Sequence, residues 1–353
     1  MKAAFLVEAG RFEIREVEDL IVPPDGLLLG VKACGICGSD LRRWKEGPPQ
    51  GVNDMTPGHE AAGVVVDVGK DVLGSYRPGD RLAIAPDVHC GECYYCLRGM
   101  YNLCDDLRLV GISPGYPGGF AEKMLLTREI LQDGIVHRLP EGLSFIEGAL
   151  AEPCSSVLAA HHKAGTSLQD TVVVMGAGPI GCLHVAIAKV RGAAVIVSEP
   201  SEMRRYMVAR FDPDLIVDPL NEDLTARVRD FTNDRGADIV ICANPVASTQ
   251  TQAVEIVRKA GRVVLFGGLP KANPMTTLDA NRIHYGEVQV VGAFSYHPSF
   301  HALALEVLSR GLVPVQQLVT HIFSLDEIDE AFRLASSGES LKVVVTSQKG
   351  QSR

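Results

Sequence analysis

The chain has 353 residues, of which 46% are hydrophobic and 22% are charged, so it is long enough for two globular domains with a sizeable core. Its net charge of −9 and its lack of any dense run of Lys or Arg argue against nucleic acid or an anionic membrane as a main partner. Charged residues such as Glu8, Arg11 and Glu13 interrupt the N-terminal segment, which therefore does not resemble a signal peptide. No apolar run approaches the roughly 18–20 residues that span a bilayer. We expect a soluble, cytoplasmic protein.

Short apolar segments separated by Gly and Pro dominate the first 150 residues, and this pattern is typical of strands. Strands are expected at residues 3–7, 12–17, 26–33, 61–68 and 81–85. We expect no long amphipathic helix before about residue 145. This part of the chain is therefore predicted to be mostly β, with its metal-ligand candidates on loops.

Four of the nine cysteines, Cys90, Cys93, Cys96 and Cys104, fall within fifteen residues. In a chain without a secretory signal, such clustering favours a metal over disulfides. Four thiolates can close tetrahedrally around Zn²⁺ and leave no open position, as in structural sites. An iron–sulfur cluster is the alternative, but the bacterial ferredoxin run has a shorter last gap and then a proline, whereas Asp105 follows here. We predict a structural zinc that holds a lobe at about residues 88–106.

A second group of candidate ligands is spread over the first 152 residues. Cys37 is followed by Ser39, His59 is adjacent to Glu60, and Glu152 stands at the edge of an apolar segment. Three such side chains and a water form the arrangement of catalytic zinc sites. Ser39 would place a hydroxyl beside that water. We therefore predict an open, catalytic zinc site, and the sequence leaves open whether Glu60 or Glu152 is the resting ligand.

Beyond residue 152, strands alternate with helices. Strands are expected at residues 171–175, 194–198, 215–217, 238–242, 262–266 and 288–292. Helices are expected at residues 180–190, 222–233 and 249–257. Alternation of this kind indicates a doubly wound parallel sheet, so the fold class is α/β. The last segment is expected to pack back on the N-terminal domain, with helices at 299–310 and 326–335, a strand at 341–346 and a frayed tail at 347–353.

The first turn of this predicted sheet carries a dinucleotide-binding pattern. It runs from Gly176 through Gly178, Pro179 and Ile180 to Gly181, directly after a strand and at the start of a helix. The glycines let the backbone approach a pyrophosphate, and the helix N-terminus supplies N–H donors.

The end of the second predicted strand favours NAD over NADP. Glu199 lies 23 residues after Gly176, close to the position of the carboxylate that binds the adenosine ribose. Such a carboxylate accepts from a 2′-hydroxyl and repels a 2′-phosphate. Arg204 follows it and is a further candidate for cofactor binding.

These motifs, in this order, are similar to those of the zinc-dependent medium-chain alcohol dehydrogenase family. The matching segments are Cys37-Gly38-Ser39-Asp40, Gly58-His59-Glu60, the four clustered cysteines, and the glycine turn at 176–181. The resemblance covers nearly the whole chain. It implies a GroES-like, β-rich catalytic domain formed by residues 1–152 and 293–353, with a Rossmann domain of six parallel strands inserted at 153–292.

Two residues narrow the resemblance to the sorbitol, or polyol, branch. Glu152 stands where alcohol dehydrogenases proper place a third zinc-binding cysteine, and Ser39 follows Cys37-Gly38 as in polyol dehydrogenases. The likeness implies a homo-oligomer, with a tetramer favoured and a dimer possible. The expected partner is a small polyol, sugar or cyclitol.

One position departs from the family pattern. Many members carry a proton-relaying histidine where this chain has Arg42, and an arginine cannot act as a general base. Arg42 and Arg43 either hold an anionic group of the substrate or are solvated surface residues. Tyr296, after the last expected Rossmann strand, is a further candidate for the substrate cleft.

The expected reaction is the reversible oxidation of a secondary alcohol to a ketone, with hydride transfer to NAD. The cofactors are one catalytic and one structural Zn²⁺ per chain and NAD, with NADP as the less favoured dinucleotide. An L-threonine-type amino-alcohol dehydrogenase is the alternative within enzymes. A zinc- and NAD-binding structural or sensing protein without turnover is the alternative outside them.

Overall fold

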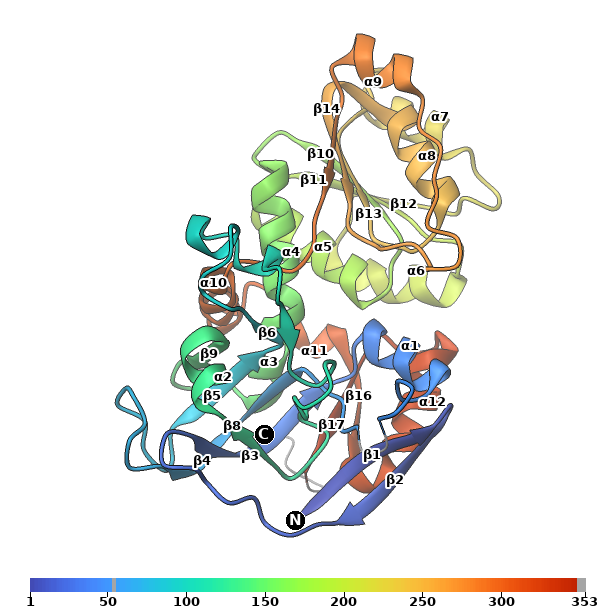
Figure 1. Cartoon of the computed structure of the whole chain (residues 1–353). Helices are drawn as coiled ribbons and strands as arrows, with labels where there is room; N and C mark the ends of the chain where they lie inside the picture. The colour runs from blue at the N-terminus through green and yellow to red at the C-terminus, as the bar shows by residue number, and fades with distance from the viewer. Residues whose placement is uncertain (53–54, 348–353) are drawn as a thin grey trace. The chain divides into compact units, whose positions relative to one another are not determined.

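The computed structural model describes residues 1–52 and 55–347 (Figure 1). The chain divides into two compact units. Unit 1 comprises Met1–Ser155, Tyr296–Gly311 and Val319–Arg353, and unit 2 comprises Ser156–Ser295 and Leu312–Leu318. The tail expected at 347–353 lies, except for residue 347, outside the described residues. Across the described parts of the chain, no helix combines the length and apolar character needed to cross a membrane.

Unit 1 is built on a seven-stranded sheet. The strand order is β16-β17-β3-β4-β5-β9, and β8 also pairs with β3. These strands are β3 (Leu27–Gly35), β4 (Glu60–Val68), β5 (Arg81–Ala85), β8 (Lys123–Leu126), β9 (Ile135–Arg138), β16 (Val319–Ser324) and β17 (Lys342–Thr346). A separate hairpin pairs β1 (Lys2–Glu8) with β2 (Arg11–Glu16). The expectation that the first part of the chain is mainly β is confirmed.

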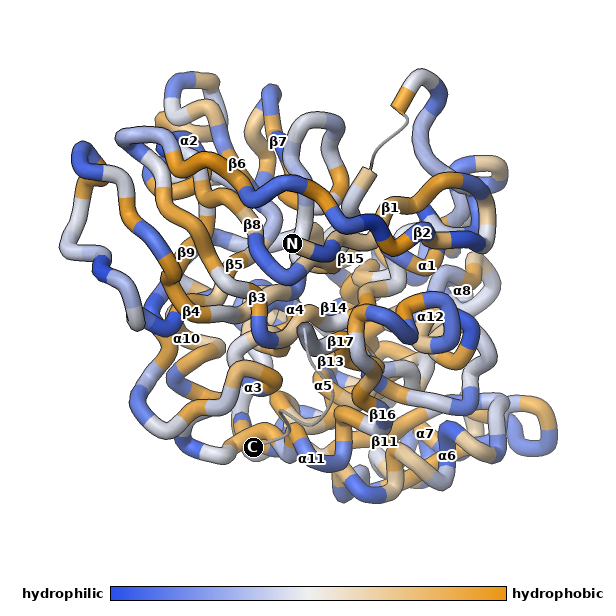
Figure 2. The backbone as a smooth tube through the Cα atoms, turned by 90° about the horizontal axis from the view of Figure 1, so that it is seen from below, coloured by the Kyte–Doolittle hydropathy of each residue, from blue (hydrophilic) through white to orange (hydrophobic). Residues whose placement is uncertain are grey.

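The core of unit 1 brings distant segments together. Phe332 of α12 (Ile328–Ser337) packs against Phe12 and Phe120, with ring centroids 4.7 and 5.5 Å apart. Helix α12 carries both hydrophobic and hydrophilic residues (Figure 2), and Ile328, Ala331 and Phe332 are its buried ones. The C-terminal segment thus completes the core of the N-terminal one.

Strand pairing in this sheet creates the candidate site. Gly35, at the end of β3, is paired with Glu60, the first residue of β4, and with Val344 of β17. The chain leaves β3 and enters α1 (Gly38–Glu46), with Cys37 as its N-cap residue. The end of β3, the start of β4 and the start of β17 therefore meet at the beginning of α1.

Helix α1 was not expected from the sequence, which predicted loops around the metal-ligand candidates. The helix is short and carries many charges, but Asp40 accepts a bond from the backbone N–H of Cys37 and stabilises its first turn. Its Trp44 packs against Phe332, with ring centroids 6.0 Å apart. Tertiary packing therefore supports a helix that its own sequence only weakly favours.

Four further helices belong wholly or partly to unit 1. They are α2 (Arg128–Asp133), α3 (Phe145–Ala149), α4 (Ala151–Ala164) and α10 (Pro298–Ser309). Helix α4 starts in unit 1 and continues into unit 2, because the boundary lies between Ser155 and Ser156.

Unit 2 is a six-stranded parallel sheet in the order β12-β11-β10-β13-β14-β15. Its strands are β10 (Thr171–Met175), β11 (Ala194–Ser198), β12 (Leu215–Val217), β13 (Ala237–Cys242), β14 (Val257–Leu265) and β15 (Gln289–Gly292). This is the doubly wound order of dinucleotide-binding domains, so the predicted fold class is confirmed. Every residue of β10 is buried, as expected for a central strand covered on both faces.

The helices of unit 2 are α5 (Pro179–Val190), α6 (Glu202–Val208), α7 (Leu224–Phe231), α8 (Ala247–Ile256), α9 (Ala280–Gly286) and α11 (Val315–Leu318). Helix α9 was not predicted, and β14 begins five residues before the expected start at 262. The early residues of β14 are mostly polar or exposed, which explains why hydrophobicity alone did not reveal them.

Candidate metal centres and cofactor site

Cys37, His59 and Glu60 form a cluster at the start of α1 and β4. Each offers one ligand atom, and these atoms all lie within 4.8 Å of one another. His59 and Glu60 are buried, at 3% and 0% exposure. A thiol, an imidazole and a carboxylate at this spacing can surround one Zn²⁺ ion.

His59 is oriented by two neighbours on opposite sides of its ring. Its Nδ1 lies 3.4 Å from Asp40 Oδ1, and its Nε2 lies 3.4 Å from Ser39 Oγ. Burial alone would lower the pKa of His59, but the negative charge of Asp40 and the proximity of Cys37 raise it well above its usual value. A carboxylate on one imidazole nitrogen leaves the other to face a metal, as in carboxylate–histidine–zinc arrangements.

Glu60 is paired with a buried lysine. Lys342 Nζ lies 2.6 Å from Glu60 Oε1 and 2.5 Å from Oε2, and it also donates to the backbone oxygen of Ile36 at 2.9 Å. Burial alone would lower the pKa of Lys342, but the Glu60 carboxylate raises it. The ammonium therefore stays charged beside the carboxylate group of the cluster.

Glu152 lies in the first turn of α4 and does not belong to the three-residue cluster. Its Oε1 accepts a hydrogen bond from the Tyr296 hydroxyl at 3.1 Å. Burial raises the pKa of Glu152 to about 7, and the charge of Glu60 adds to this rise while His59 opposes it. Tyr296 is itself 2% exposed. The structure thus gives the two glutamates different partners.

The two candidate substrate arginines occupy neighbouring positions on α1. Arg42 is exposed, whereas Arg43 is partly buried. Arg43 lies 3.8 Å from Glu46 and donates to the backbone oxygen of Gly47 at 3.5 Å. The Arg43 guanidinium therefore finds its partners at the C-terminal end of its own helix, α1.

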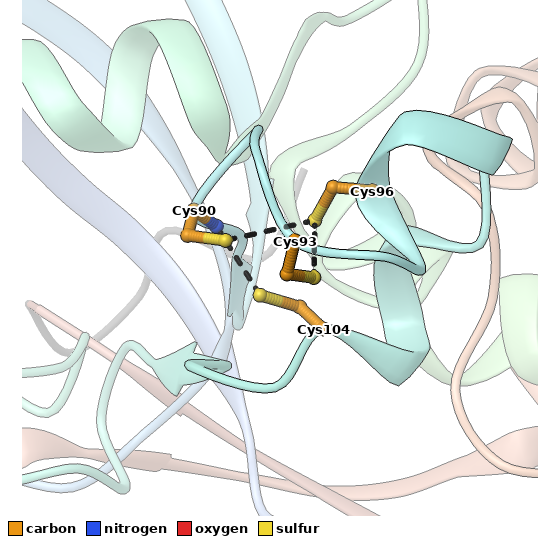
Figure 3. A group of neighbouring side chains, drawn as sticks. All are labelled: Cys90, Cys93, Cys96 and Cys104. Atoms are coloured by element: carbon orange, nitrogen blue, oxygen red, sulfur yellow. Dashed lines mark hydrogen bonds between the residues drawn. The ribbon is translucent and has the colours of Figure 1, made fainter.

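The four clustered cysteines point toward one another (Figure 3). Their sulfur atoms all lie within 4.8 Å of one another, with Cys93–Cys96 at 3.5 Å and Cys90–Cys96 at 4.0 Å. The edge of a zinc–sulfur tetrahedron with bonds of about 2.3 Å is about 3.8 Å, so these distances fit a zinc site with four cysteine ligands. Backbone N–H groups, first that of Asp105, lower the pKa of Cys93 to about 6, whereas burial raises the pKa of Cys96 to about 12.

The lobe that carries these cysteines has little core of its own. Tyr94, Leu97 and Leu103 are 59%, 72% and 45% exposed, so its larger apolar side chains face outward. A bound metal would supply the cross-link that a hydrophobic core usually provides.

The glycine turn leaves open space beside the start of α5. Gly178 is the N-cap residue of α5, and a Cβ atom at this position would meet open space. A Cβ at Gly181 would collide with the backbone oxygen of Gly176, so this position accepts only glycine. Pro179 begins the helix and Ile180 follows, which leaves the first N–H groups of α5 available to an anion.

Glu199 follows β11 and is 3% exposed, with its carboxylate directed into the glycine turn. Arg204 lies in the first turn of α6 and is partly buried, and its N–H donates to Ser201 Oγ at 3.4 Å. The turn, Glu199 and Arg204 all belong to unit 2.

Lys342 was not predicted from the sequence as a residue of the site. It precedes a run of three valines, and a charged residue at the start of a buried strand is the available signal, because lysine is rarely buried without a partner. Its partner lies 282 residues earlier, so sequence spacing gave no indication of the pair.

Two family models match the chain. The alcohol dehydrogenase GroES-like domain matches residues 23–138, and the zinc-binding dehydrogenase model matches residues 179–310. The first falls within unit 1 and the second covers most of the nucleotide-binding sheet.

Curated relatives match over almost the full chain. D-arabitol-phosphate dehydrogenase of Enterococcus avium is 33% identical over 336 residues, covering 93% of both chains. Sorbitol dehydrogenase of Bacillus subtilis is 33% identical over 355 residues, covering 98% of this chain and 97% of the relative. Among solved structures, a zinc-binding dehydrogenase from Sinorhizobium meliloti bound to NADP has a TM-score of 0.88 and 30% identity, and the match covers 98% of each chain.

Proposed function

Because the chain belongs to the zinc-binding alcohol dehydrogenase family, we propose that it oxidises a secondary alcohol of a polyol, sugar or cyclitol to the ketone. The observation that carries this proposal is the cluster of Cys37, His59 and Glu60, with the Ser39 hydroxyl beside His59. The relatives named sorbitol dehydrogenase and D-arabitol-phosphate dehydrogenase support the substrate class.

Cys37, His59 and Glu60 would hold the catalytic zinc, which would supply a Lewis acid to the alcohol oxygen. Asp40 fixes the orientation of the His59 ring. Ser39 carries a hydroxyl that both accepts and donates, so it receives the alcohol proton and relays it toward solvent. Glu152, with its pKa near 7, is a second proton acceptor close to neutral pH.

NAD is the dinucleotide that we propose as the hydride acceptor. An acidic side chain, Glu199, follows β11, where a carboxylate disfavours a 2′-phosphate. The glycine turn and the N-terminus of α5 would hold the pyrophosphate, and Arg204 would lie near the adenosine end. Because the similar structure from Sinorhizobium meliloti is bound to NADP, the affinities of this chain for NAD⁺ and NADP⁺ are to be compared directly.

We further propose a homo-oligomer, with a tetramer favoured over a dimer. Strand β15 forms an edge of the sheet in unit 2, and an open edge can pair with the same edge of a second copy. Tyr285 and Phe294, on either side of this strand, are 76% and 60% exposed.

The substrate class is tested by NAD⁺ reduction with the zinc-loaded protein and a panel of compounds. The panel holds neutral polyols, cyclitols, sugar phosphates, aldonates and L-threonine. Turnover of neutral polyols or cyclitols supports the proposal and leaves Arg42 and Arg43 as surface residues. Turnover of the anionic compounds alone makes the two arginines substrate ligands. Turnover of L-threonine alone, or of no compound while zinc and NAD are bound, contradicts the proposed function.

The metal cluster is tested by replacing Cys37 with serine. This variant should lose turnover by at least about 100-fold and keep its NAD affinity, because Cys37 and the glycine turn lie in different units. Cys34→Ala is the matched control, since Cys34 is a buried thiol three residues away that does not belong to the cluster. Full activity of Cys37→Ser with its metal content reduced would refute the mechanism.

A further inference from the structure

Both the backbone and the carboxylate of Glu199 form hydrogen bonds with neighbouring residues. Its backbone N–H donates to Val217 at 3.1 Å, and its backbone oxygen accepts from Arg205 Nη1 at 2.9 Å. Its carboxylate accepts two backbone N–H groups, from Ala177 to Oε2 at 2.7 Å and from Ser201 to Oε1 at 2.9 Å. With 3% exposure, this side chain is a fixed part of the fold.

One of the two residues whose N–H groups Glu199 binds, Ala177, is the second residue of the glycine turn. Ala177 is fully buried, its N–H is bound by Glu199, and its backbone oxygen faces the Cys182 thiol at 3.7 Å. Gly176 is tied to β11 as well, because its N–H donates to the Ser198 oxygen at 2.8 Å. Both polar groups of the Ala177 backbone are therefore held by side chains from neighbouring elements.

The same carboxylate also organises the start of α6. Ser201, whose N–H it binds, is the N-cap residue of α6 and accepts the N–H of Arg204. One side chain thus fixes the turn before α5 and the turn before α6. Bonds from N–H groups to a carboxylate are short and roughly twice as strong as neutral ones.

From these contacts we propose that Glu199 is a positioning residue that holds the glycine turn in the shape that receives the pyrophosphate. This role rests on the proposed dinucleotide-binding function, and it is additional to the effect of the Glu199 carboxylate near the adenosine ribose. A side chain that only selected between NAD and NADP would change the preference between them. A side chain that shapes the turn supports the binding of both dinucleotides equally.

The first test uses the free protein and no cofactor. In Glu199→Gln, the amide can offer only one oxygen, so its NH2 group faces one of the two backbone N–H groups. Hydrogen exchange at Ala177 or at Ser201, whichever N–H the amide nitrogen faces, should become about 10- to 100-fold faster, as expected for the loss of a bond to a charged group. Glu202→Gln is the matched control, because Glu202 is an exposed glutamate three residues away. Unchanged exchange at both Ala177 and Ser201 would overturn the proposal.

The second test compares two dinucleotides by calorimetry. One is NAD⁺, and the other is an NAD⁺ analogue whose adenosine ribose lacks the 2′- and 3′-hydroxyls. If Glu199 shapes the turn, Glu199→Gln should weaken the binding of both dinucleotides, that of the analogue by about 10-fold or more, although only NAD⁺ can also lose a contact with the ribose. Weakening of NAD⁺ alone would show a ribose contact and refute the positioning role.

The outcomes separate this inference from the proposed function. If the wild-type protein binds neither NAD⁺ nor NADP⁺, the proposed function fails, while the exchange result still decides whether Glu199 holds the turn. If the wild type binds NAD⁺ and Glu199→Gln behaves like the control Glu202→Gln in both tests, the proposed function stands and the positioning role fails.

Discussion

Replacing Lys342 with methionine should destabilise the metal-free protein by about 3–5 kcal/mol, because the change leaves Glu60 as an unpaired buried carboxylate. The two side chains are 5% and 0% exposed, and Lys342 Nζ lies 2.5–2.6 Å from the carboxylate oxygens. Because both side chains are buried, neither group becomes hydrated when its partner is removed. Methionine keeps much of the volume but removes both the charge and the hydrogen bond to the Ile36 oxygen, so the part of the loss that a double variant recovers reports on the ion pair.

The change is measured by thermal and urea unfolding of chelator-treated protein. For a domain of this size, about 3–5 kcal/mol corresponds to a fall in melting temperature of about 6–20 °C. The double variant Lys342→Met/Glu60→Gln removes both charges and should recover most of the loss. Lys123→Met is a matched control, because its ion pair with Asp19 is exposed and should contribute less than about 1 kcal/mol.

Two results would refute this reasoning. A Lys342→Met variant within about 1 kcal/mol of the wild type would show that the Glu60 carboxylate is not a buried charge in the folded protein. A double variant as unstable as the single one would show that the loss comes from packing around Lys342 and from its lost bond to Ile36, not from the ion pair. The Lys123→Met control separates both results from a general effect of lost surface charge.

The remaining predictions concern the cysteine lobe and acid stability. Cys104→Ser should lower the zinc content, measured by mass spectrometry of the metal, by one ion per chain and lower the melting temperature; an unchanged metal content would contradict the four-cysteine site. His161 Nε2 and His184 Nδ1 lie 3.2 Å apart in the core of unit 2, and burial lowers the pKa of His161 to about 3 and that of His184 well below its usual value. Since the unfolded state then binds more protons, stability should fall as the pH drops below about 6.5, by about 1.4 kcal/mol per pH unit for each histidine. Replacing both histidines with leucine should reduce this slope in unfolding experiments between pH 6.5 and 4.5, and an equal slope would refute the assignment.

The sequence predicted those features that depend on local spacing. The four cysteines lie within fifteen residues, and their predicted closure on one point is matched by sulfur atoms within 4.8 Å of one another. The glycine turn follows a run of buried apolar residues and precedes a helix, so its context was visible along the chain. Three strands of the parallel sheet, β10, β11 and β12, have the bounds that hydrophobicity predicted.

Other features depend on contacts between residues that lie far apart in the sequence, and the spacing of motifs along the chain does not predict such contacts. Lys342 meets Glu60 only because β17 joins β3 in the same sheet. Tyr296 meets Glu152 only because the chain returns from unit 2 to unit 1 at that point. Helix α1 escaped prediction because its stability comes from Asp40 and from packing on α12, whereas its own residues are mostly charged.

The two glutamates show what the structure adds to the proposed chemistry. In the sequence, Glu60 and Glu152 were equivalent candidates for the resting zinc ligand. In the structure, Glu60 lies beside the Lys342 ammonium, and it shares a cluster with Cys37 and His59. Glu152 instead has the neutral Tyr296 hydroxyl as its partner and a pKa raised to about 7. A carboxylate clustered with a thiol and an imidazole suits a metal ligand, whereas a carboxyl group that gains and loses a proton near neutral pH suits proton transfer from the alcohol, so we propose Glu60 for the first role and Glu152 for the second.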